Sequence, residues 1–253
     1  MSHAGAQCFP SGPIQALRNA ERVVVLTGSG ISVESGVPTF REAQTGLWER
    51  YDPQQLATPE AFARDPRLVW EWYEWRRDLV RETTPNPGHK ALAELERRIP
   101  EFALVTQNVD GLHARAGSRN VVELHGNILR SRCSLEGEVA EPEEHDGSVP
   151  PHCPRCGAFL RPDVVWFGEM LPPGALEIAS EAARGCELLF SIGTSSLVYP
   201  AAVLPLEALE HGATLVEINP SETPLTRRAD YALRGPAAEV LPDLLREALS
   251  PPD

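Results

Sequence analysis

Six short apolar segments alternate with helical segments along most of this chain, and that alternation is the strongest constraint on its fold. Continuous runs of Val, Ile and Leu are typical of strands buried on both faces, and intervening helices connect such strands in parallel. The sequence therefore predicts an α/β fold, a Rossmann-like doubly wound parallel sheet of about six strands. The predicted strands are residues 23–26, 102–105, 121–123, 187–192, 214–218 and 231–233, and the predicted helices are residues 14–20, 67–81, 88–98, 175–183, 201–210 and 237–249.

The first predicted strand runs directly into a Gly-x-Gly sequence, Gly28-Ser29-Gly30. Glycines in this place are typical of a loop that turns tightly beside the phosphates of a dinucleotide. The dehydrogenase form of the motif requires a third glycine at position 33, which is Val here, and the next glycine is Gly36. Taken by itself, the segment fits either a nucleotide-binding loop or an ordinary turn.

Polar loops follow four of the other predicted strands. They lie at residues 107–110, 125, 193–195 and 219–221. Each of them alone fits a turn or a structural histidine. Because the carboxyl ends of parallel strands meet at one edge of a sheet, we expect all five loops to lie together. Such a set predicts a large polar ligand that extends across this edge.

Residues 127–172 interrupt the alternation and are rich in Cys, Pro, Glu and Gly, which predicts a small inserted subdomain. Cys153-Pro-Arg-Cys156 is typical of a zinc knuckle, and Cys133 lies upstream at a suitable distance, so these three thiolates are the predicted ligands of a structural zinc ion. A four-cysteine site would need Cys at position 136, where the chain has Glu. A ribbon without metal is the alternative. The candidates for the fourth ligand are Glu136, His145, His152 and water.

Composition narrows the functional classes. The chain has 253 residues, of which 42% are hydrophobic and 23% charged, as in an ordinary globular protein. A formal net charge of −13 argues against a nucleic-acid partner, because phosphate binding needs clustered Lys and Arg. There is no apolar run of transmembrane length and no signal-peptide core, and five unevenly spaced cysteines are a poor disulfide framework. We therefore expect a soluble cytoplasmic protein without a membrane partner.

Seven motifs occur in order along the chain, at residues 27–32, 38–41, 106–113, 124–126, 165–169, 193–195 and 218–220. Together, they resemble those of the sirtuin family of NAD-dependent protein lysine deacylases over about residues 14–248. The family usually has Ala where Ser29 stands. The resemblance implies a single catalytic domain, with a Rossmann-like core of about residues 14–40, 100–126 and 171–250, a helical module of about 41–99 and a zinc-ribbon-like insertion of about 127–170.

The resemblance also implies an activity and its residues. Acyl groups would be transferred from lysine to ADP-ribose with release of nicotinamide, with His125 as the general base and Asn108 and Asp110 as further catalytic residues. An imidazole suits this step, since a ribose hydroxyl must lose a proton near neutral pH. The implied partners are acyl-lysine proteins, and we expect a monomer. The implied NAD-binding residues are Gly28, Ser29, Gly30, Ile31, Phe40, Arg41, Trp48, Gln107, Asn108, Val109, Asp110, Gly193, Thr194, Ser195, Asn219, Pro220, Ser221 and Ala237.

Two further segments concern the acylated substrate. Residues 164–168 are predicted to form an edge strand, and in the family this strand pairs with the substrate peptide through Val165, Trp166, Phe167 and Gly168. Tyr73 and Arg76 are three residues apart and therefore share one helix face, where Arg can bind a carboxylate through two hydrogen bonds. With Ala57, this pair resembles the sirtuin class (class III) that removes succinyl and malonyl groups. An ion-paired surface Arg is the alternative.

Two other functions remain open at this stage. A dehydrogenase that transfers hydride would use the same fold, but the third glycine and an acidic ribose partner after the second strand are missing. A sensor that binds NAD or ADP-ribose without turnover would need the same loops but no general base.

Overall fold

The computed structural model describes residues 9–38, 52–140 and 147–249 of the chain, and its main sheet contains all six predicted strands. The strand order is β3-β2-β1-β6-β7-β8, and every neighbouring pair is parallel. The order reverses direction between β1 and β6, which confirms a doubly wound sheet with its switch point there. The strands are β1 Arg22–Thr27, β2 Glu101–Thr106, β3 Val121–Glu123, β6 Leu188–Ile192, β7 Thr214–Ile218 and β8 Tyr231–Leu233.

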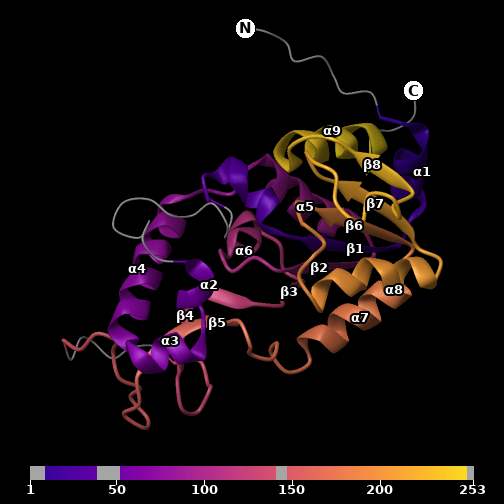
Figure 1. The fold of residues 1–253 in the computed structure, drawn as a ribbon. Coiled ribbons are helices and arrows are strands. Elements are labelled where there is room, and N and C mark those ends of the chain that lie inside the picture. The colour runs from indigo at the N-terminus through magenta and orange to yellow at the C-terminus, as the bar shows by residue number, and fades with distance from the viewer. Residues whose placement is uncertain (1–8, 39–51, 141–146, 250–253) are drawn as a thin grey trace, which may run out of the picture.

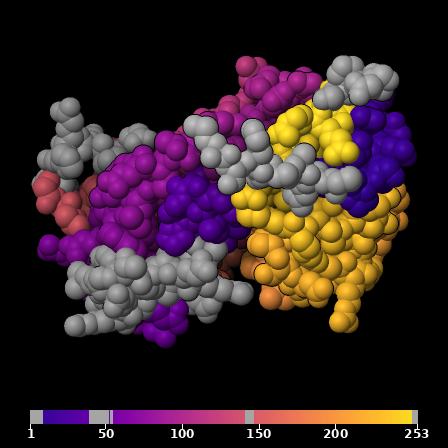
Figure 2. Space-filling model, turned by 90° about the horizontal axis from the view of Figure 1, so that it is seen from above, coloured from indigo at the N-terminus to yellow at the C-terminus, as the bar shows by residue number. Residues whose placement is uncertain are grey.

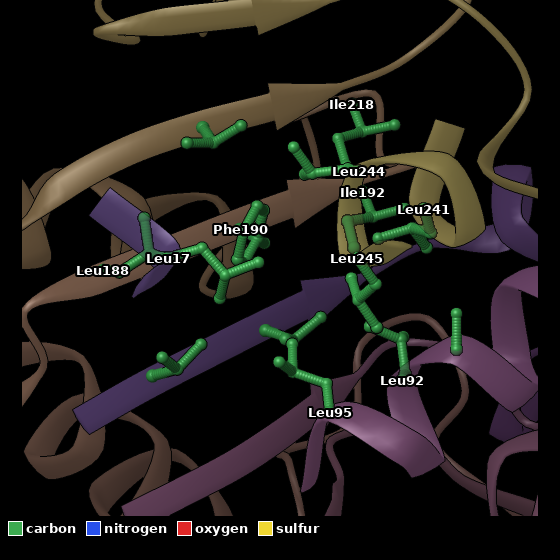
Figure 3. Packing of buried hydrophobic residues seen from close by; sticks show 14 of the residues in the cluster. Leu17, Leu92, Leu95, Leu188, Phe190, Ile192, Ile218, Leu241, Leu244 and Leu245 are labelled. Atoms are coloured by element: carbon green, nitrogen blue, oxygen red, sulfur yellow. The ribbon is translucent and has the colours of Figure 1, made fainter. Parts of the chain in front are cut away.

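The side chains of strand β1 pack into two separate hydrophobic clusters, because they alternate between the two faces of the sheet. Val23 and Val25 lie in the cluster shown in Figure 3, together with residues of the helices on that face. Val24 and Leu26 belong to the cluster on the opposite face. The layers are visible in Figure 1, with α1 (Ser11–Asn19), α5 (Pro87–Arg98) and α9 (Ala237–Leu249) on the first face and α7 (Ala175–Gly185) and α8 (Leu204–Glu210) on the second.

A smaller module, formed by residues 53–82, 126–140 and 147–164, lies beside the carboxyl edge of the sheet (Figure 1). In the space-filling view of Figure 2, its purple helical part lies on one side of the molecule and the yellow and orange C-terminal part lies on the other. The longest helix of this module, α4 (Pro66–Glu82), contains the predicted helix at residues 67–81. It begins where the Asp65 carboxylate accepts the Leu68 N–H at 3.0 Å and proline occupies the first turn. No helix in the described part of the chain is both long and apolar enough to cross a membrane. The remaining elements are η1 (Ser29–Ser35), α2 (Pro53–Leu56), α3 (Pro59–Arg64), α6 (Leu112–Ala116), η3 (Ala201–Val203) and the antiparallel pair β4 (Gly126–Cys133) and β5 (Leu160–Val164).

The predicted edge strand at residues 164–168 is wrong in its position. The strand is β5, which ends at Val164; Val165 and Trp166 have no regular secondary structure, and Phe167 and Gly168 form a turn. Their backbone is held from two sides, since Val165 N–H donates to the His125 carbonyl and Phe167 N–H donates to the Ala57 carbonyl, each at 2.9 Å. The apolar residues of this segment therefore bridge the sheet and the smaller module instead of extending a ladder.

The loops after β1 and β6 touch each other at the switch point. Gly30 N–H donates to the Gly193 carbonyl at 2.8 Å, and a Cβ at Gly30 would lie 2.7 Å from the Gly193 Cα. A Cβ at Gly28 would lie 2.8 Å from the Gly193 oxygen. Gly28 has an extended φ of −122°, so it is the missing side chain that matters there, not a special turn conformation. Gly28 and Gly30 are therefore required because the loop after β6 packs directly against them.

Gly30→Ala should therefore force the two loops apart. We expect a loss of about 1–3 kcal/mol in the free energy of unfolding, the usual cost of overpacking, together with weaker NAD binding. Chemical denaturation and calorimetric titration with NAD would measure the two effects. Gly185→Ala is the matched control, because a Cβ at Gly185 meets no atom within 4 Å. Equal stability of both variants would contradict this account of the glycine pair.

Candidate functional site

One cavity of about 1340 Å³ lies along the carboxyl edge of the sheet and continues into the smaller module. All five predicted polar loops reach it, so the edge expected from the sequence is a continuous site. The predicted residues that line it are Gly28, Ser29, Gly30, Gln107, Asn108, Val109, Asp110, His125, Gly193, Thr194, Ser195, Asn219, Pro220 and Ser221 from the sheet, and Ala57, Tyr73, Arg76, Val165, Trp166, Phe167 and Gly168 from the smaller module and its connections.

Two predicted cofactor-binding residues do not line the cavity. Ile31 and Ala237 are buried in the hydrophobic cluster on the α1, α5 and α9 face of the sheet, so their side chains contribute to packing. Ile31 lies in η1, which packs it towards α5, and the Ile31 carbonyl accepts the Asn86 side-chain N–H at 2.7 Å. Phe40, Arg41 and Trp48 lie outside the described residues.

Thr194 connects three of the loops. Its hydroxyl accepts a hydrogen bond from the Gln107 side chain at 3.1 Å, and its carbonyl accepts one from the Asn219 side chain at 2.9 Å. Thr194 itself is 6% exposed. The loops after β2, β6 and β7 are therefore fixed to one another before any ligand binds. Pre-formed positions of this kind lower the ordering cost of binding a long polar ligand.

Asn108 and Asp110 converge on Ser32, a residue that the sequence did not single out. The Ser32 hydroxyl donates to Asp110 Oδ2 at 2.7 Å and accepts from Asn108 Nδ2 at 3.2 Å, and the same amide also bonds the Gly28 carbonyl at 3.1 Å. Burial raises the pKa of Asp110, and hydrogen bonds from the Leu112 N–H and Ser32 oppose that rise. The first two loops thus share one buried polar network.

Two buried histidines extend this network beneath the cavity. His89 Nε2 lies 3.4 Å from the Ser32 hydroxyl, and His113 Nε2 lies 3.0 Å from the Thr27 hydroxyl. Burial lowers the pKa of His89 to about 4 and that of His113 to about 3, so both are neutral at physiological pH. Their spacing along the chain carries no signal for this, because only folding brings α5 and α6 behind the first loop.

His125 has a defined tautomer. Its Nδ1 lies 2.9 Å from the Gln107 carbonyl oxygen, which can only accept, so Nδ1 carries the proton and Nε2 has a lone pair when the ring is neutral. Burial lowers the pKa of His125 below its ordinary value, and the bond to Gln107 opposes that shift. A half-buried imidazole that lines a cavity with an unprotonated Nε2 is chemically suited to accept a proton.

The far end of the cavity is formed by aromatic residues around Tyr73. Its hydroxyl accepts the Trp166 indole N–H at 3.0 Å and so keeps its own proton for donation. Burial raises the pKa of Tyr73 to about 12, which keeps it protonated. Ala57, which is 4% exposed, leaves room beside it because its side chain is a single methyl group. The chain thus provides a small space with a hydroxyl donor.

Arg76 lines the same end of the cavity from the next turn of α4. Its guanidinium carbon lies 4.9 Å from the centre of the Trp72 ring and 5.9 Å from that of Tyr73, within the range of cation–π attraction. Burial lowers the pKa of Arg76, although a guanidinium stays charged at neutral pH. A guanidinium at this end of the cavity can bind a carboxylate through two hydrogen bonds.

The three predicted cysteine ligands meet Glu136 at the end of the β4–β5 pair. Potential ligand atoms of Cys133, Glu136, Cys153 and Cys156 all lie within 4.8 Å of one another. The backbone N–H groups of Arg155 and Cys156 lower the pKa of the Cys153 thiol to about 7, which favours the thiolate that zinc binds. Three thiolates and one carboxylate are an acceptable zinc set, so the residues fit a structural zinc ion.

The other fourth-ligand candidates differ in position. His152 Nδ1 lies 3.0 Å from the Ser148 hydroxyl, and its ring stacks on Phe159, whereas His145 lies outside the described residues. Glu136 pairs with Arg155 at 2.9 Å through Oε2. That ion pair orients the carboxylate, which leaves its second oxygen for a metal ion. Within the described residues, Glu136 is the candidate that the fold brings to the cysteines.

Fold and site together define a doubly wound α/β protein whose cavity runs from the switch point of the sheet into an inserted ribbon and helical module. The family model described as "Sir2 family" matches residues 28–200. NAD-dependent protein deacylase 1 of Pseudomonas aeruginosa is 53% identical over 243 residues, which cover 93% of this chain and 97% of that protein. The chain belongs to the Sir2 family.

Solved structures agree with this result. A Sir2 homolog in complex with NAD has a TM-score of 0.89 at 47% identity and covers 98% of this chain and 96% of its own. A Sir2 protein bound to an acetylated peptide has a TM-score of 0.83 at 32% identity, with coverage of 92% and 96%. The likeness therefore extends over both the sheet and the smaller module.

The metal site gives a direct test. We expect the purified protein to retain zinc, Cys153→Ser to lose it, and Glu136→Ala to release it faster to a chelator because the fourth ligand is missing. Glu136→Cys should slow release, since thiolate is a stronger zinc ligand than carboxylate. Elemental analysis and a colorimetric chelator assay would measure content and rate. Equal release from wild type and Glu136→Ala would exclude Glu136 as a ligand.

Proposed function

We propose that this chain is an NAD-dependent protein-lysine deacylase that removes succinyl and malonyl groups, and also acetyl groups, from lysine side chains. The products are nicotinamide, free lysine and O-acyl-ADP-ribose. The observation that carries the proposal is His125, whose unprotonated Nε2 shares one cavity with the polar loops of the sheet and with Arg76. Membership of the Sir2 family and the names of its relatives support it.

NAD fits the sheet side of this cavity. It would supply the ribose C1′ that accepts the acyl oxygen and the bond to nicotinamide that breaks. The loop at Gly28, Ser29 and Gly30 would hold the pyrophosphate mainly through Ser29, because the N–H groups of Gly28 and Gly30 donate to the Ile192 and Gly193 carbonyls. Asn108 and Asp110 orient the ribose and the carboxamide. The residues that contact the adenosine end are Gly193, Thr194, Ser195, Asn219, Pro220 and Ser221.

His125 acts as the general base in this proposal. A ribose hydroxyl has to lose its proton before its oxygen can attack the acyl carbon, and Nε2 accepts that proton. The Gln107 carbonyl, which holds Nδ1–H, stabilises the imidazolium formed in the step. Because the pKa of His125 is lowered by burial, the base is still neutral somewhat below the ordinary imidazole value of about 6.5.

The acyl preference follows from the far end of the cavity. A succinyl or malonyl group ends in a carboxylate, and burying it without a partner would cost several kcal/mol or shift its pKa. Arg76 supplies the charge and Tyr73 a hydroxyl donor. An acetyl group has no such carboxylate and needs only the space near the reacting atoms. The same site therefore accepts both groups, with higher preference for the charged ones.

The protein substrate binds along the segment that follows β5. Val165, Trp166, Phe167 and Gly168 line the cavity beside it. Because the N–H groups of Val165 and Phe167 donate within the chain, pairing with the peptide would use other backbone groups of this segment, and such pairing depends little on the sequence around the lysine. The protein acts as a cytoplasmic monomer, without a nucleic-acid or membrane partner. The negative net charge supports a lysine-rich protein partner over a nucleic acid, since an acidic surface attracts lysine side chains and repels phosphates.

The general base can be tested by substitution. His125→Ala should lower kcat about 100-fold to 10,000-fold, the usual contribution of a positioned base, and leave NAD binding intact. For the wild type, kcat/KM should decline only at a pH below about 6.5, because burial lowers the pKa of the base. Mass spectrometry of the acyl-ADP-ribose product and titration with NAD would measure both. NAD binding without turnover in the wild type would favour the sensor function, and reduced cofactor would favour a dehydrogenase.

The acyl preference has its own test. Arg76→Met keeps the length and apolar stem of the side chain but removes its charge, so it should abolish removal of succinyl groups and spare removal of acetyl groups. Specificity constants for succinyl-, malonyl- and acetyl-lysine peptides would measure the effect. The matched control is Arg67→Gln, which removes a charge from the exposed face of the same helix. Parallel loss of both activities would make Arg76 a structural residue.

A further inference from the structure

Arg77, next to Arg76 on α4, points away from the cavity and into the β4–β5 ribbon. It is 3% exposed, which is rare for a guanidinium and requires full pairing. Its Nε donates to the Ile128 carbonyl at 2.5 Å, and its Nη2 donates to the Arg130 carbonyl at 2.9 Å and the Ser131 hydroxyl at 3.1 Å. Its Nη1 pairs with Glu74.

These acceptors exist because the β4–β5 ladder is interrupted. The pairing register shifts between Asn127 and Ser131, so the carbonyls of Ile128 and Arg130 lie within the irregular stretch. The planar guanidinium spans both ends of that stretch, which a single ammonium could not do. The Arg77 guanidinium carbon also lies 4.8 Å from the centre of the Trp70 ring, and Trp70 packs with Cys133 and Cys153 of the predicted zinc site.

The same stretch of β4 is tied to the sheet side of the site. Ile128 N–H donates to the Val109 carbonyl at 2.8 Å, and Val109 and Ile128 both line the cavity. Arg77 thus connects α4, which carries Tyr73 and Arg76, to the loop that carries Asn108 and Asp110. A helix shift at Arg77 would change the distance between the two ends of the cavity.

We propose that Arg77 is a positioning residue for acyl selection: by fixing α4 on the irregular stretch of β4, it holds Arg76 at the place where the carboxylate of a succinyl or malonyl group ends. A bidentate Arg–carboxylate pair depends strongly on orientation, and small displacements in a site have large effects on rate. An acetyl group is too short to reach Arg76 and is therefore insensitive to such a shift. The inference rests on the proposed function and deepens it.

The test compares Arg77→Lys and Arg77→Gln with wild type, using succinyl- and acetyl-lysine peptides at saturating NAD. The ratio of kcat/KM for succinyl over acetyl should fall about tenfold, as expected for the loss of one charged hydrogen bond. The change should lie mainly in KM for the succinyl peptide, with acetyl removal within about twofold of wild type. Arg67→Lys is the control, because Arg67 is an exposed residue on the same helix.

Each alternative outcome has a distinct meaning. Equal losses of both activities, or an unchanged ratio, would overturn the positioning role. If thermal melting shows that Arg77→Gln does not fold, Arg77→Lys and Trp70→Phe decide the question, and Trp70→Phe should lower the ratio in the same direction by a smaller factor. A wild type that does not remove succinyl groups would refute the proposed acyl preference itself, whereas an active wild type with parallel losses refutes only the role of Arg77.

Discussion

The close contact between the loops after β1 and β6 is the constraint on which the site depends. Gly30 and Gly193 meet through their backbones, and a side chain on either would collide with the other loop. Because these strands flank the switch point, their loops would otherwise diverge as the chain winds in opposite directions. Asn108 then bonds the Gly28 carbonyl, which fixes the third loop to the pair. The cavity edge is therefore assembled by the protein itself.

Desolvation gives the groups in this cavity their chemical character. Burial lowers the pKa of His125 and of Arg76 and raises the pKa of Asp110 and Tyr73. A neutral imidazole remains a base, whereas a guanidinium remains charged and gains from an anionic partner. Burial thus leaves a neutral imidazole and a charged guanidinium in the same cavity. The smaller module contributes to this burial at the end of the cavity that holds Tyr73 and Arg76, where Trp166 is 2% exposed.

Local patterns predicted most of the fold, because strand and helix periodicities are written in consecutive residues. All six sheet strands and the predicted helix at residues 67–81, which is α4, are confirmed. The error at residues 164–168 has a physical reason, since bulky apolar residues suit a strand but also a bridge between two layers, and only packing distinguishes them. Ser32, His89 and His113 were not predicted as a group, because a hydrogen-bond network joins residues that are distant in the chain.

The sequence by itself determined the order of strands and helices, the polar loops at their carboxyl ends and the cysteine spacing, since each depends on near neighbours in the chain. Tertiary structure alone decided which residues meet. It turned Ile31 and Ala237 into the core, brought Glu136 to the cysteines and set Arg77 into the irregular stretch of β4. These outcomes depend on the packing of segments far apart in sequence, where shape and hydrogen-bond geometry select the contacts.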